Sequence, residues 1–295
     1  MKRLLITGGS GFVGGHLLGQ ARKDWEVHAT YESRPFQFSS VTTIPLSLGN
    51  PYQIGRVLEQ IRPHVLIHAA AKGDLELCEK DPAAAFRINA EATRILSRLC
   101  AAHSCRLVYV STDMVFDGRE GNYSESGPAN PINVYGRSKL DGEMQVLSEC
   151  PQAAVARSAL IYGKPVTGSN SFSEKILVQV YSGKTCPLYT DQIRSPILVD
   201  DLACALLELA GNDFQGIIHL GGRDSVVRFT FGTALAEVAH FEKSLLKPVR
   251  MDDVPTEAPR PRDSSLDTGM ARSVLKTRLR GYSEGLAAVY GSALL

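Results

Sequence analysis

The sequence predicts an α/β fold in which helices wind over both faces of a parallel β-sheet. Short apolar segments alternate along the first 160 residues with segments of helical periodicity. The first apolar segment runs directly into a glycine-rich turn, and a helical pattern follows that turn. With 295 residues, 44% hydrophobic and 21% charged, the chain is globular in composition and long enough for such a domain and a smaller one.

The first half of the chain contains the clearest alternation of strands and helices. Strands are expected where apolar runs are bounded by turn residues, at 3–7, 25–31, 41–46, 64–70, 106–111 and 153–158. Helices are expected where the apolar period is helical, at 12–22, 51–61, 82–103 and 133–150. Strands joined by helices predict parallel pairing, as in a doubly wound Rossmann sheet.

The second half of the chain is less regular. We expect a polar loop at 163–173, helices at 173–182, 197–209 and 231–241, a strand at 217–221, and an irregular proline-rich loop at 247–265. We therefore predict an NAD(P)-binding Rossmann domain over residues 1–160, to which 195–222 are expected to return. A smaller C-terminal, substrate-binding subdomain is expected over 161–194 and 223–295.

Charge and cysteine content exclude several classes of protein. A net charge of +1 argues against a nucleic-acid binder that works through a basic surface. No apolar run approaches the roughly 18–20 residues of a membrane span. The six cysteines show no C-x-x-C pair and no histidine at metal-ligand spacing. We expect a reduced, cytoplasmic protein without a metal site and without nucleic-acid or membrane partners.

The glycine-rich turn after the first strand predicts a dinucleotide site. Glycines let the backbone approach a pyrophosphate, which then lies at the positive end of the following helix. The alternative is a tight turn without a ligand, and the strand–turn–helix context favours the dinucleotide. The residues expected to contact the cofactor are Gly8, Gly11, Phe12, Val13 and Gly14.

The residues that end the second strand bear on the choice of cofactor. Tyr31 stands where an acidic residue would bind the adenosine ribose of NAD. Arg34 is placed to meet a 2′-phosphate, and Ser33 could add a hydrogen bond. These residues favour NADP(H). NAD(H) stays open as the alternative, because the Glu32 carboxylate could bind the adenosine ribose of NAD if its side chain turned inward.

Three polar residues predict the chemistry. Tyr135 and Lys139 are four residues apart and share one face of a helix. Thr112, at the end of an earlier strand, can be brought against that face. Together these side chains can hold a carbonyl oxygen, deliver a proton to it and anchor a redox cofactor. The alternative is a surface tyrosine, a solvated lysine and a buried threonine, which would be preferred if the glycine turn were missing.

Several segments resemble the extended short-chain dehydrogenase/reductase superfamily, and within it the dTDP-4-dehydrorhamnose reductase type. The S-T-D-M-V-F-D-G run at 111–118 and the N-V-Y-G-R-S-K-L-D-G-E run at 133–143 are similar to the most specific motifs of that family. Weaker likenesses lie at 6–11, 65–71, 81–89 and 259–268. The resemblance implies NADP(H)-dependent reduction of a nucleotide-linked 4-keto-6-deoxysugar, with Thr112, Tyr135 and Lys139 as catalytic residues.

The resemblance also implies further site residues. The strand end at Ala69, Ala70 and Ala71 would line the cofactor. Asn89 is grouped with it, although we favour a buried amide that joins two backbone segments. The residues assigned to the substrate are Asp113, which could instead cap a turn, Met114, Arg194 and, first among the loop arginines, Arg260.

Departures from the family pattern leave the substrate and other readings open. Met114 stands where the family usually has tyrosine, and Ser47 where an aspartate usually meets the adenine. One alternative is a nucleotide-sugar epimerase or dehydratase of the same superfamily. Another is a non-catalytic, cofactor-binding regulatory subunit. The sugar, the nucleotide and the oligomeric state stay open, a homodimer included.

Overall fold

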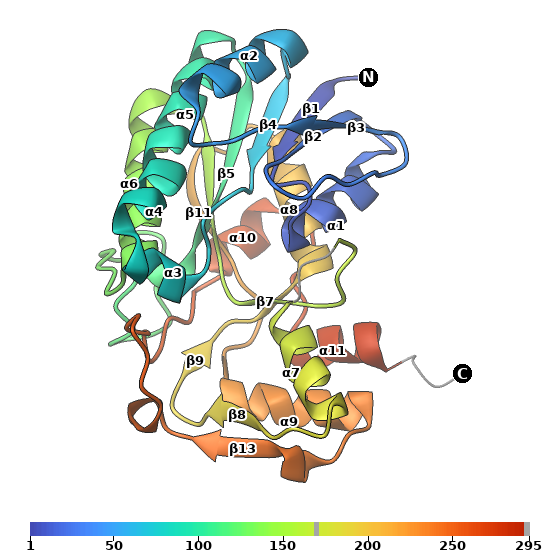
Figure 1. The fold of residues 1–295 in the computed structure, drawn as a ribbon, viewed down its shortest axis with the longest axis vertical. Helices are drawn as coiled ribbons and strands as arrows, with labels where there is room; N and C mark the ends of the chain where they lie inside the picture. Colours follow the sequence, from blue (N-terminus) through green and yellow to red (C-terminus); the bar gives the residue numbers. More distant parts are fainter. Residues whose placement is uncertain (168–170, 292–295) are drawn as a thin grey trace.

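A seven-stranded sheet forms the centre of the protein in the computed structural model, which describes residues 1–167 and 171–291 (Figure 1). Its strand order is β11-β6-β5-β4-β1-β2-β3, and every neighbouring pair is parallel. This arrangement confirms the predicted doubly wound α/β fold. The strands are β1 (Arg3–Thr7), β2 (Glu26–Tyr31), β3 (Val41–Pro45), β4 (Val65–His68), β5 (Arg106–Thr112), β6 (Ala154–Ser158) and β11 (Gly216–Leu220).

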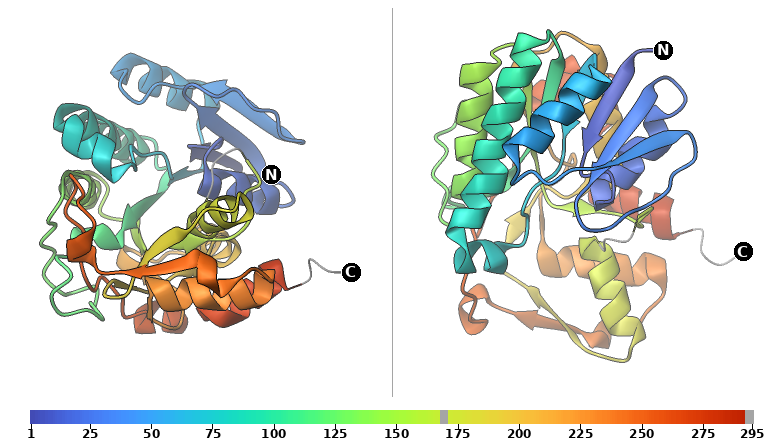
Figure 2. Two further views of the ribbon diagram at one scale, coloured as in Figure 1. Left: turned by 60° about the horizontal axis from the view of Figure 1, so that its bottom comes forward. Right: turned by 45° about the horizontal axis from the view of Figure 1, so that its top comes forward.

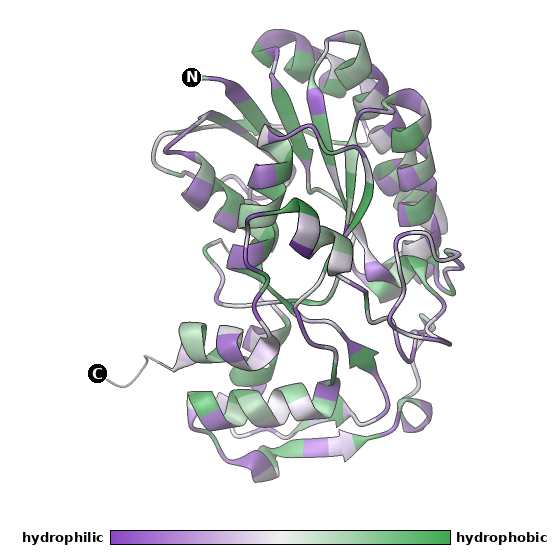
Figure 3. Ribbon diagram, turned by 180° about the vertical axis from the view of Figure 1, so that it is seen from behind, coloured by the Kyte–Doolittle hydropathy of each residue, from purple (hydrophilic) through white to green (hydrophobic). Residues whose placement is uncertain are grey.

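Helices cover both faces of the sheet because alternate strand residues point to opposite faces. Leu4 and Ile6 pack with α1 (Phe12–Ala21), α8 (Val199–Gly211) and α10 (Gly269–Val274). Leu5, between them, packs with the opposite layer. That layer consists of α2 (Pro51–Ile61), α5 (Ala92–Ala102) and α6 (Val134–Glu149), which lie side by side in Figure 2. In Figure 3 the strands are mainly hydrophobic, whereas the outer helices are mixed.

The order of the strands reverses between β1 and β4, and this places a site. The chain leaves β1 for β2 and β3 on one side and then returns to build β4, β5 and β6 on the other. Ligands of such sheets bind beyond the carboxyl ends of the strands at this switch point. The glycine turn follows β1, and Thr112 ends β5, so both lie at the binding edge.

The predicted helix at 82–103 is interrupted. Pro82–Phe86 form α4, Arg87–Glu91 form a π-helical turn, and α5 continues from Ala92. A π-helical turn widens the helix locally and often marks a functional position, and here it contains Asn89. A short preceding helix, α3 (Leu75–Lys80), was not predicted; the Asp74 carboxylate caps it by accepting the Leu77 N–H at 3.0 Å.

The smaller subdomain lies beside the carboxyl edge of the sheet (Figure 1). Its core contains Leu177, Leu188, Phe231 and Leu246. The prediction of an irregular loop at 247–265 is wrong at its start, because β13 (Leu246–Val249) pairs with β8 (Cys186–Tyr189). Pro248 is tolerated there because this pair has only edge strands. The remaining elements are α7 (Phe172–Tyr181), α9 (Arg228–Ala239), α11 (Tyr282–Tyr290), β7 (Ile161–Tyr162), β8 (Cys186–Tyr189), β9 (Ile193–Arg194), β10 (Ile197–Leu198), β12 (Val226–Val227), β13 (Leu246–Val249) and the 3-10 turns Asp113–Val115, Lys243–Leu245 and Met251–Asp253.

Other boundaries shift by a few residues. The predicted helix at 197–209 begins at Val199, because β10 occupies the two residues before it. The predicted helix at 231–241 begins three residues earlier, at Arg228. Residues 168–170 of the predicted polar loop lie outside the described residues. The pairing of β11 with β6 supports the expected return of 195–222 to the first domain; the division into domains stays a prediction.

Two findings complete the description. Within 1–167 and 171–291, no helix is both long and apolar enough to cross a membrane. The six cysteines, all within these ranges, are free thiols, and only Cys204 is exposed.

Candidate active site

The glycine turn between β1 and α1 has the geometry of an anion cradle. Gly8 has a φ of +76°, which a residue with a side chain adopts only with strain. A Cβ on Gly14 would lie 2.1 Å from the Gly8 carbonyl oxygen, so α1 can approach the turn only with glycine there. No described side chain caps the N-terminus of α1 at Gly11. The N–H groups of its first turn are therefore free to bind a pyrophosphate.

The chain after β2 separates the two residues that bear on the cofactor. The Glu32 carboxylate accepts a hydrogen bond of 3.0 Å from Ser47 Oγ, beyond the end of β3. Arg34 instead lines a cavity of 340 Å³ together with Ser10, which belongs to the glycine turn. Tyr31 packs edge-on against Phe36 of the same segment. Ser33 is exposed and is not part of this cavity wall.

A second cavity, of 540 Å³, opens between the sheet and the smaller subdomain. It brings together residues that are separated by up to 247 positions in the chain, from Val13 to Arg260. Ala70 lies just outside its wall and packs against Gly8 instead. The predicted residues that line the cavity are Val13, Ala69, Ala71, Thr112, Asp113, Met114, Tyr135, Lys139, Arg194 and Arg260.

The start of α6 explains why Tyr135 lies near Thr112. The Asn133 side chain caps the helix by accepting the Gly136 N–H at 2.7 Å and donates to the Pro259 carbonyl at 2.9 Å. A Cβ on Gly136 would lie 2.1 Å from the Met114 carbonyl oxygen. Glycine at this position therefore lets α6 pack directly on the turn that follows Thr112.

Burial sets the protonation of the predicted proton donor. Burial raises the pKa of Tyr135 to about 12, and the neighbouring Thr112 hydroxyl opposes that rise. Tyr135 is therefore a neutral phenol at neutral pH in the protein without ligands, and it has a proton to give.

Lys139, which follows Tyr135 by about one turn of α6, is buried. Its Nζ donates to the Val110 carbonyl at 2.8 Å and lies 4.1 Å from the centroid of the Tyr109 ring. Burial lowers the pKa of Lys139 from 10.5 to about 7, while Glu143 acts in the opposite direction. The ammonium is thus poorly compensated inside the protein and would be stabilised by hydroxyl acceptors of a bound ligand.

A buried ion pair behind the cavity ties α6 to the sheet. Arg157 of β6 donates to Glu143 Oε2 at 2.7 Å, and the Ser111 hydroxyl of β5 donates to Oε1 of the same carboxylate at 2.5 Å. All three side chains are buried. Because Ser111 precedes Thr112 and Glu143 lies one turn after Lys139, this pair fixes the two halves of the predicted catalytic set. Sequence reasoning missed this role.

Asp113 does not cap the turn after β5, contrary to one of its two predicted readings. The Thr112 hydroxyl accepts the Met114 N–H at 3.2 Å and serves as the cap. Asp113 is fully buried and bound by Arg194, whose Nε and Nη2 donate at 2.6 and 2.5 Å. Burial raises the pKa of Asp113, and Arg194 opposes the shift. The two residues together form one wall of the cavity.

Arg228 is a basic residue of the cavity that sequence reasoning missed. Its Nη1 donates to Gln192 Oε1 at 3.0 Å, and its guanidinium stacks 4.1 Å from the Phe172 ring centroid. Its buried Nε has no hydrogen-bond partner among the described residues. Burial, with the nearby charges of Arg194 and Arg260, lowers its pKa to about 9. The side chain is half-buried and pairs with no described carboxylate, so an anionic ligand would stabilise its charge.

Arg260 lies at the same cavity but already has a partner. Its Nη2 donates to Glu76 Oε1 at 2.7 Å. Arg262, which also lies in the proline-rich segment, is exposed and pairs with Asp191 and Asp252 away from the cavity. Arg228 is therefore better placed than either residue to receive a new anion.

Asn89 has a structural position. Its Oδ1 accepts the Lys72 N–H at 2.8 Å, while its Nδ2 donates to the Lys72 carbonyl at 3.0 Å and to Ser138 Oγ at 2.9 Å. These bonds engage the whole amide and join the chain after β4 to α6. The geometry favours the buried-amide reading over the contact with the cofactor.

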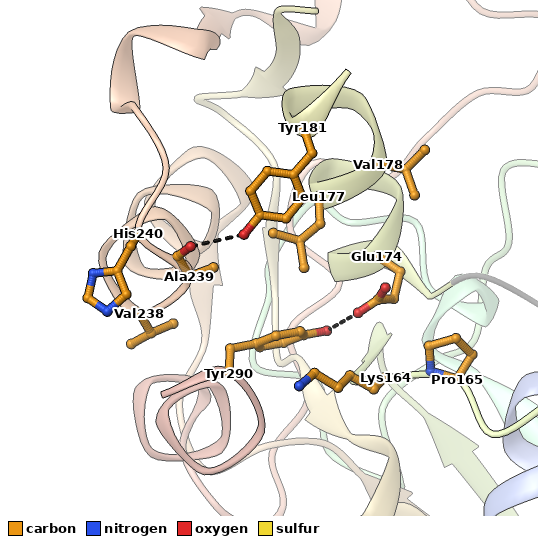
Figure 4. Close-up of a pocket in the computed structure, with 10 residues that line it drawn as sticks. All are labelled: Lys164, Pro165, Glu174, Leu177, Val178, Tyr181, Val238, Ala239, His240 and Tyr290. Atoms are coloured by element: carbon orange, nitrogen blue, oxygen red, sulfur yellow. Dashed lines mark hydrogen bonds between the residues drawn. The ribbon is translucent and has the colours of Figure 1, made fainter. Parts of the chain in front are cut away.

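A larger cavity, of 770 Å³, lies elsewhere and contains none of the predicted site residues (Figure 4). It opens between α7, the end of α9 and α11. The Tyr290 hydroxyl donates to Glu174 at 2.8 Å, and the Tyr181 hydroxyl donates to the Ala239 carbonyl at 2.9 Å. These two bonds join residues of its own wall, and the cavity contains neither the glycine turn nor Thr112, Tyr135 and Lys139.

Comparison with known proteins places this chain in a family. The family model described as the RmlD substrate binding domain matches residues 1–294. The chain is 32% identical over 293 residues to the dTDP-4-dehydrorhamnose reductase of Mycobacterium tuberculosis, covering 97% of this chain and 91% of that protein. It is 29% identical over 273 residues to methionine adenosyltransferase 2 subunit beta of Danio rerio, covering 90% and 83%.

The fold has a close match among solved structures. The crystal structure of dTDP-4-dehydrorhamnose reductase from Bacillus anthracis in complex with NADP aligns with a TM-score of 0.88 at 27% identity. The alignment covers 98% of this chain and 99% of that one. These findings confirm the resemblance read from the motifs.

Proposed function

The chain belongs to the RmlD substrate binding domain family, and on this basis we propose that it is an NADP(H)-dependent reductase of a nucleotide-linked 4-keto-6-deoxysugar. One observation carries the proposal. A single cavity at the carboxyl edge of the sheet contains Thr112, Tyr135 and Lys139, and its lining also includes Arg194, Arg228 and Arg260. It thus combines groups for reducing a carbonyl with groups for binding phosphate.

The glycine turn fits the pyrophosphate of a dinucleotide, since its first-turn N–H groups are free and its glycines leave room. When bound, the reduced nicotinamide supplies a hydride for the keto carbon. Gly8, Gly11, Phe12, Val13 and Gly14 would hold the pyrophosphate, and Ala69, Ala70 and Ala71 would border the rest of the cofactor.

Tyr135 gives the proton in this proposal. Its hydroxyl is neutral at neutral pH and can donate to the keto oxygen as negative charge develops there. Thr112 would hold the same oxygen by a hydrogen bond and fix its position. Lys139 would bind the nicotinamide ribose, and its ammonium would stabilise the phenolate that Tyr135 leaves behind.

The arginines define the class of substrate. Five basic and three acidic side chains line the cavity, so it favours an anion of low charge. A nucleoside diphosphate joined to a sugar is such an anion. Arg228, which lines the cavity and pairs with no described carboxylate, would bind the diphosphate with its guanidinium, and Arg260 would assist from its pair with Glu76.

Two structural details support NADP(H) over NAD(H). Arg34 lines a cavity with Ser10 of the glycine turn, where it can meet a 2′-phosphate. The carboxylate of Glu32 is bound to Ser47, beside the third strand. Ser47 stands where an adenine contact is expected, so Glu32 would approach the base and leave the ribose phosphate to Arg34.

A second candidate function rests on a specific likeness. Relatives at similar identity are named as subunit beta of methionine adenosyltransferase 2. The pair of Asp113 and Arg194 occupies polar groups that could otherwise bind a sugar. This chain could then bind the cofactor and a partner enzyme. An epimerase or dehydratase is less well supported, because Asp113 is the only acid beside Thr112 and it is paired.

An assay of cofactor consumption separates these functions. The protein is incubated with NADPH and dTDP-4-dehydrorhamnose, which an epimerase forms in place from the 4-keto-6-deoxyglucose precursor. A reductase consumes one NADPH for each reduced sugar. An epimerase or dehydratase changes the sugar without net loss of NADPH, and a regulatory subunit binds NADPH but changes neither. The predicted homodimer and cytoplasmic location are separate proposals.

A further inference from the structure

His16, in the helix that follows the glycine turn, has two partners that only accept hydrogen bonds. Its Nδ1 lies 2.8 Å from Asp200 Oδ1, and its Nε2 lies 2.8 Å from the Lys164 carbonyl oxygen. A neutral imidazole has one N–H and can satisfy only one of them. The geometry therefore fits an imidazolium, which donates from both nitrogens.

The surroundings of His16 agree with a positive charge. Burial lowers the pKa of His16, but the Asp200 carboxylate and the Lys164 carbonyl outweigh this effect and raise it above 6.5. From α1 itself, the Phe12 ring meets the imidazole edge-on at 5.6 Å. Arg280 also acts on the Asp200 carboxylate, but it is itself bound to Asp201.

The contact with Lys164 fixes a segment of the chain over the glycine turn. The Lys164 side chain extends into the cavity of Figure 4, with Nζ 5.4 Å from the Tyr290 ring centroid, while its carbonyl faces α1. Three residues later, the Thr167 hydroxyl donates to the Gly11 carbonyl at 2.8 Å. A Cβ on Gly15 would lie 2.7 Å from Thr167 Oγ1, so this approach depends on glycine.

The same segment forms part of the predicted cofactor site. Val166 and Thr167 line the cavity that contains Ser10 and Arg34. Residues 163–167 therefore connect the histidine to the wall that would face the adenosine 2′-phosphate. Among the described residues, two hydrogen bonds tie this segment to α1, and only the one at His16 can titrate. A neutral ring that keeps its N–H on the Asp200 carboxylate, the stronger acceptor, has none left for the Lys164 carbonyl.

We propose that His16, as an imidazolium, is a positioning residue for the cofactor: it holds residues 163–167 against α1 and makes the affinity for NADPH depend on its proton. The inference rests on the cofactor part of the proposed function and is independent of the sugar. Because protonated His16 holds residues 163–167 in the arrangement that binds the cofactor, the affinity for NADPH is greatest below the pKa of His16. The affinity falls as the pH rises through that pKa.

Two substitutions separate the two bonds of His16. In His16→Gln the amide nitrogen can take the place of Nε2 and donate to the Lys164 carbonyl at every pH. In His16→Asn the shorter amide can take the place of Nδ1 and reach Asp200, but not Lys164. His16→Gln thus keeps the bond to the Lys164 carbonyl, and His16→Asn removes it. Neither variant has a group that titrates at position 16.

The test is a titration of each protein with NADPH, followed by calorimetry, from about pH 7 to about pH 9.5, above the titration of the 2′-phosphate. Relative to His16→Gln, wild type is expected to lose about tenfold in affinity over this range, the worth of one charge-assisted hydrogen bond. His16→Gln should stay near the wild-type value at the lower pH, and His16→Asn should bind weakly throughout. Lys139 and the other titrating groups are common to all three proteins, so their effects cancel in the ratio of wild-type to variant affinity at each pH.

The proposal is overturned if wild type and His16→Gln have parallel pH profiles, or if His16→Asn binds as tightly as His16→Gln. Proton NMR of the His16 ring provides a second readout that needs no cofactor. Its pKa should lie above 6.5 in wild type and fall in Asp200→Asn, and a wild-type pKa below 6.5 would contradict the imidazolium. Neither measurement uses the sugar, so failure of the reductase assay would leave this result unaffected.

Discussion

Arg194 binds both carboxylate oxygens of Asp113 inside the cavity that contains Tyr135. Both side chains are buried, and the pair joins the turn after β5 to β9 of the smaller subdomain. Removing one member of a buried pair leaves the other charge without compensation. The pair is therefore a structural connection as well as a wall of the site.

This relationship predicts a stability effect. Asp113→Asn leaves Arg194 buried without its carboxylate and should lower the free energy of unfolding by about 3–5 kcal/mol. The double variant Asp113→Asn/Arg194→Met should recover part of this loss, since no buried charge remains. Urea unfolding of wild type, Asp113→Asn, Arg194→Met and the double variant provides the measurement. Additive losses in the double variant would mean that the pair contributes no coupling.

Arg34 should select the cofactor. In Arg34→Ala, affinity for NADPH should fall about tenfold, the worth of one charge-assisted hydrogen bond, while affinity for NADH should change little. The exposed Arg56 on α2 offers a matched control, in which neither affinity should change. Equal weakening of both cofactors in Arg34→Ala, or a wild-type preference for NADH, would return the selecting role to Glu32.

Replacing Arg228 should preserve or raise the stability of the protein but lower its affinity for a nucleoside diphosphate. Arg228→Met removes a half-buried cation without a carboxylate partner among the described residues, so the protein without ligand should be at least as stable as wild type. Affinity for dTDP should fall by about tenfold or more.

Two other arginines give the scale for that result. Arg260→Ala should weaken dTDP less than Arg228→Met, because Glu76 already engages Arg260. Arg262→Met, an exposed control, should leave dTDP binding unchanged. Calorimetric titration with dTDP measures all three, and unchanged affinity in Arg228→Met would remove that residue from the site.

The buried Lys139 should lower the free energy of unfolding by an amount that depends on pH. Its pKa falls from 10.5 to about 7 in the folded protein, so the unfolded chain binds more protons between these values. Stability therefore rises with pH across this window, and the full cost is present below about pH 7. Lys139→Met should raise the free energy of unfolding most at low pH and least near pH 10. An advantage that grows with pH would contradict the lowered pKa.

The sequence was sufficient for the main sheet because its signals are local. Each strand is a compact apolar run, and the order glycine turn, Thr112, Tyr135 and Lys139 places these residues at one edge of any such sheet. Most of the elements that were missed or only partly predicted are short, and the longest for which no prediction was made, α11, has nine residues. Helix α3 and strands β8 and β13 have six residues or fewer, and the β8–β13 pair depends on contacts across 60 positions.

The site was less predictable because its charged residues pair with residues that are far away in the sequence. Nothing near Arg194 in the sequence indicates that it binds Asp113, 81 residues away. Arg228 lies at the start of α9, three residues before the predicted start of that helix, and its burial follows from packing on Phe172. Asn89 was placed beside the cofactor by resemblance, yet its amide is fully engaged with Lys72 and Ser138.

The most direct test of the proposed reduction is a comparison of wild type with Tyr135→Phe. Both proteins are titrated with NADPH and then assayed for NADPH consumption with dTDP-4-dehydrorhamnose. Phenylalanine keeps the ring and loses the proton, so Tyr135→Phe should bind NADPH normally and turn over about 100- to 10,000-fold more slowly. Turnover within threefold of wild type would contradict the assignment of Tyr135 as the proton donor.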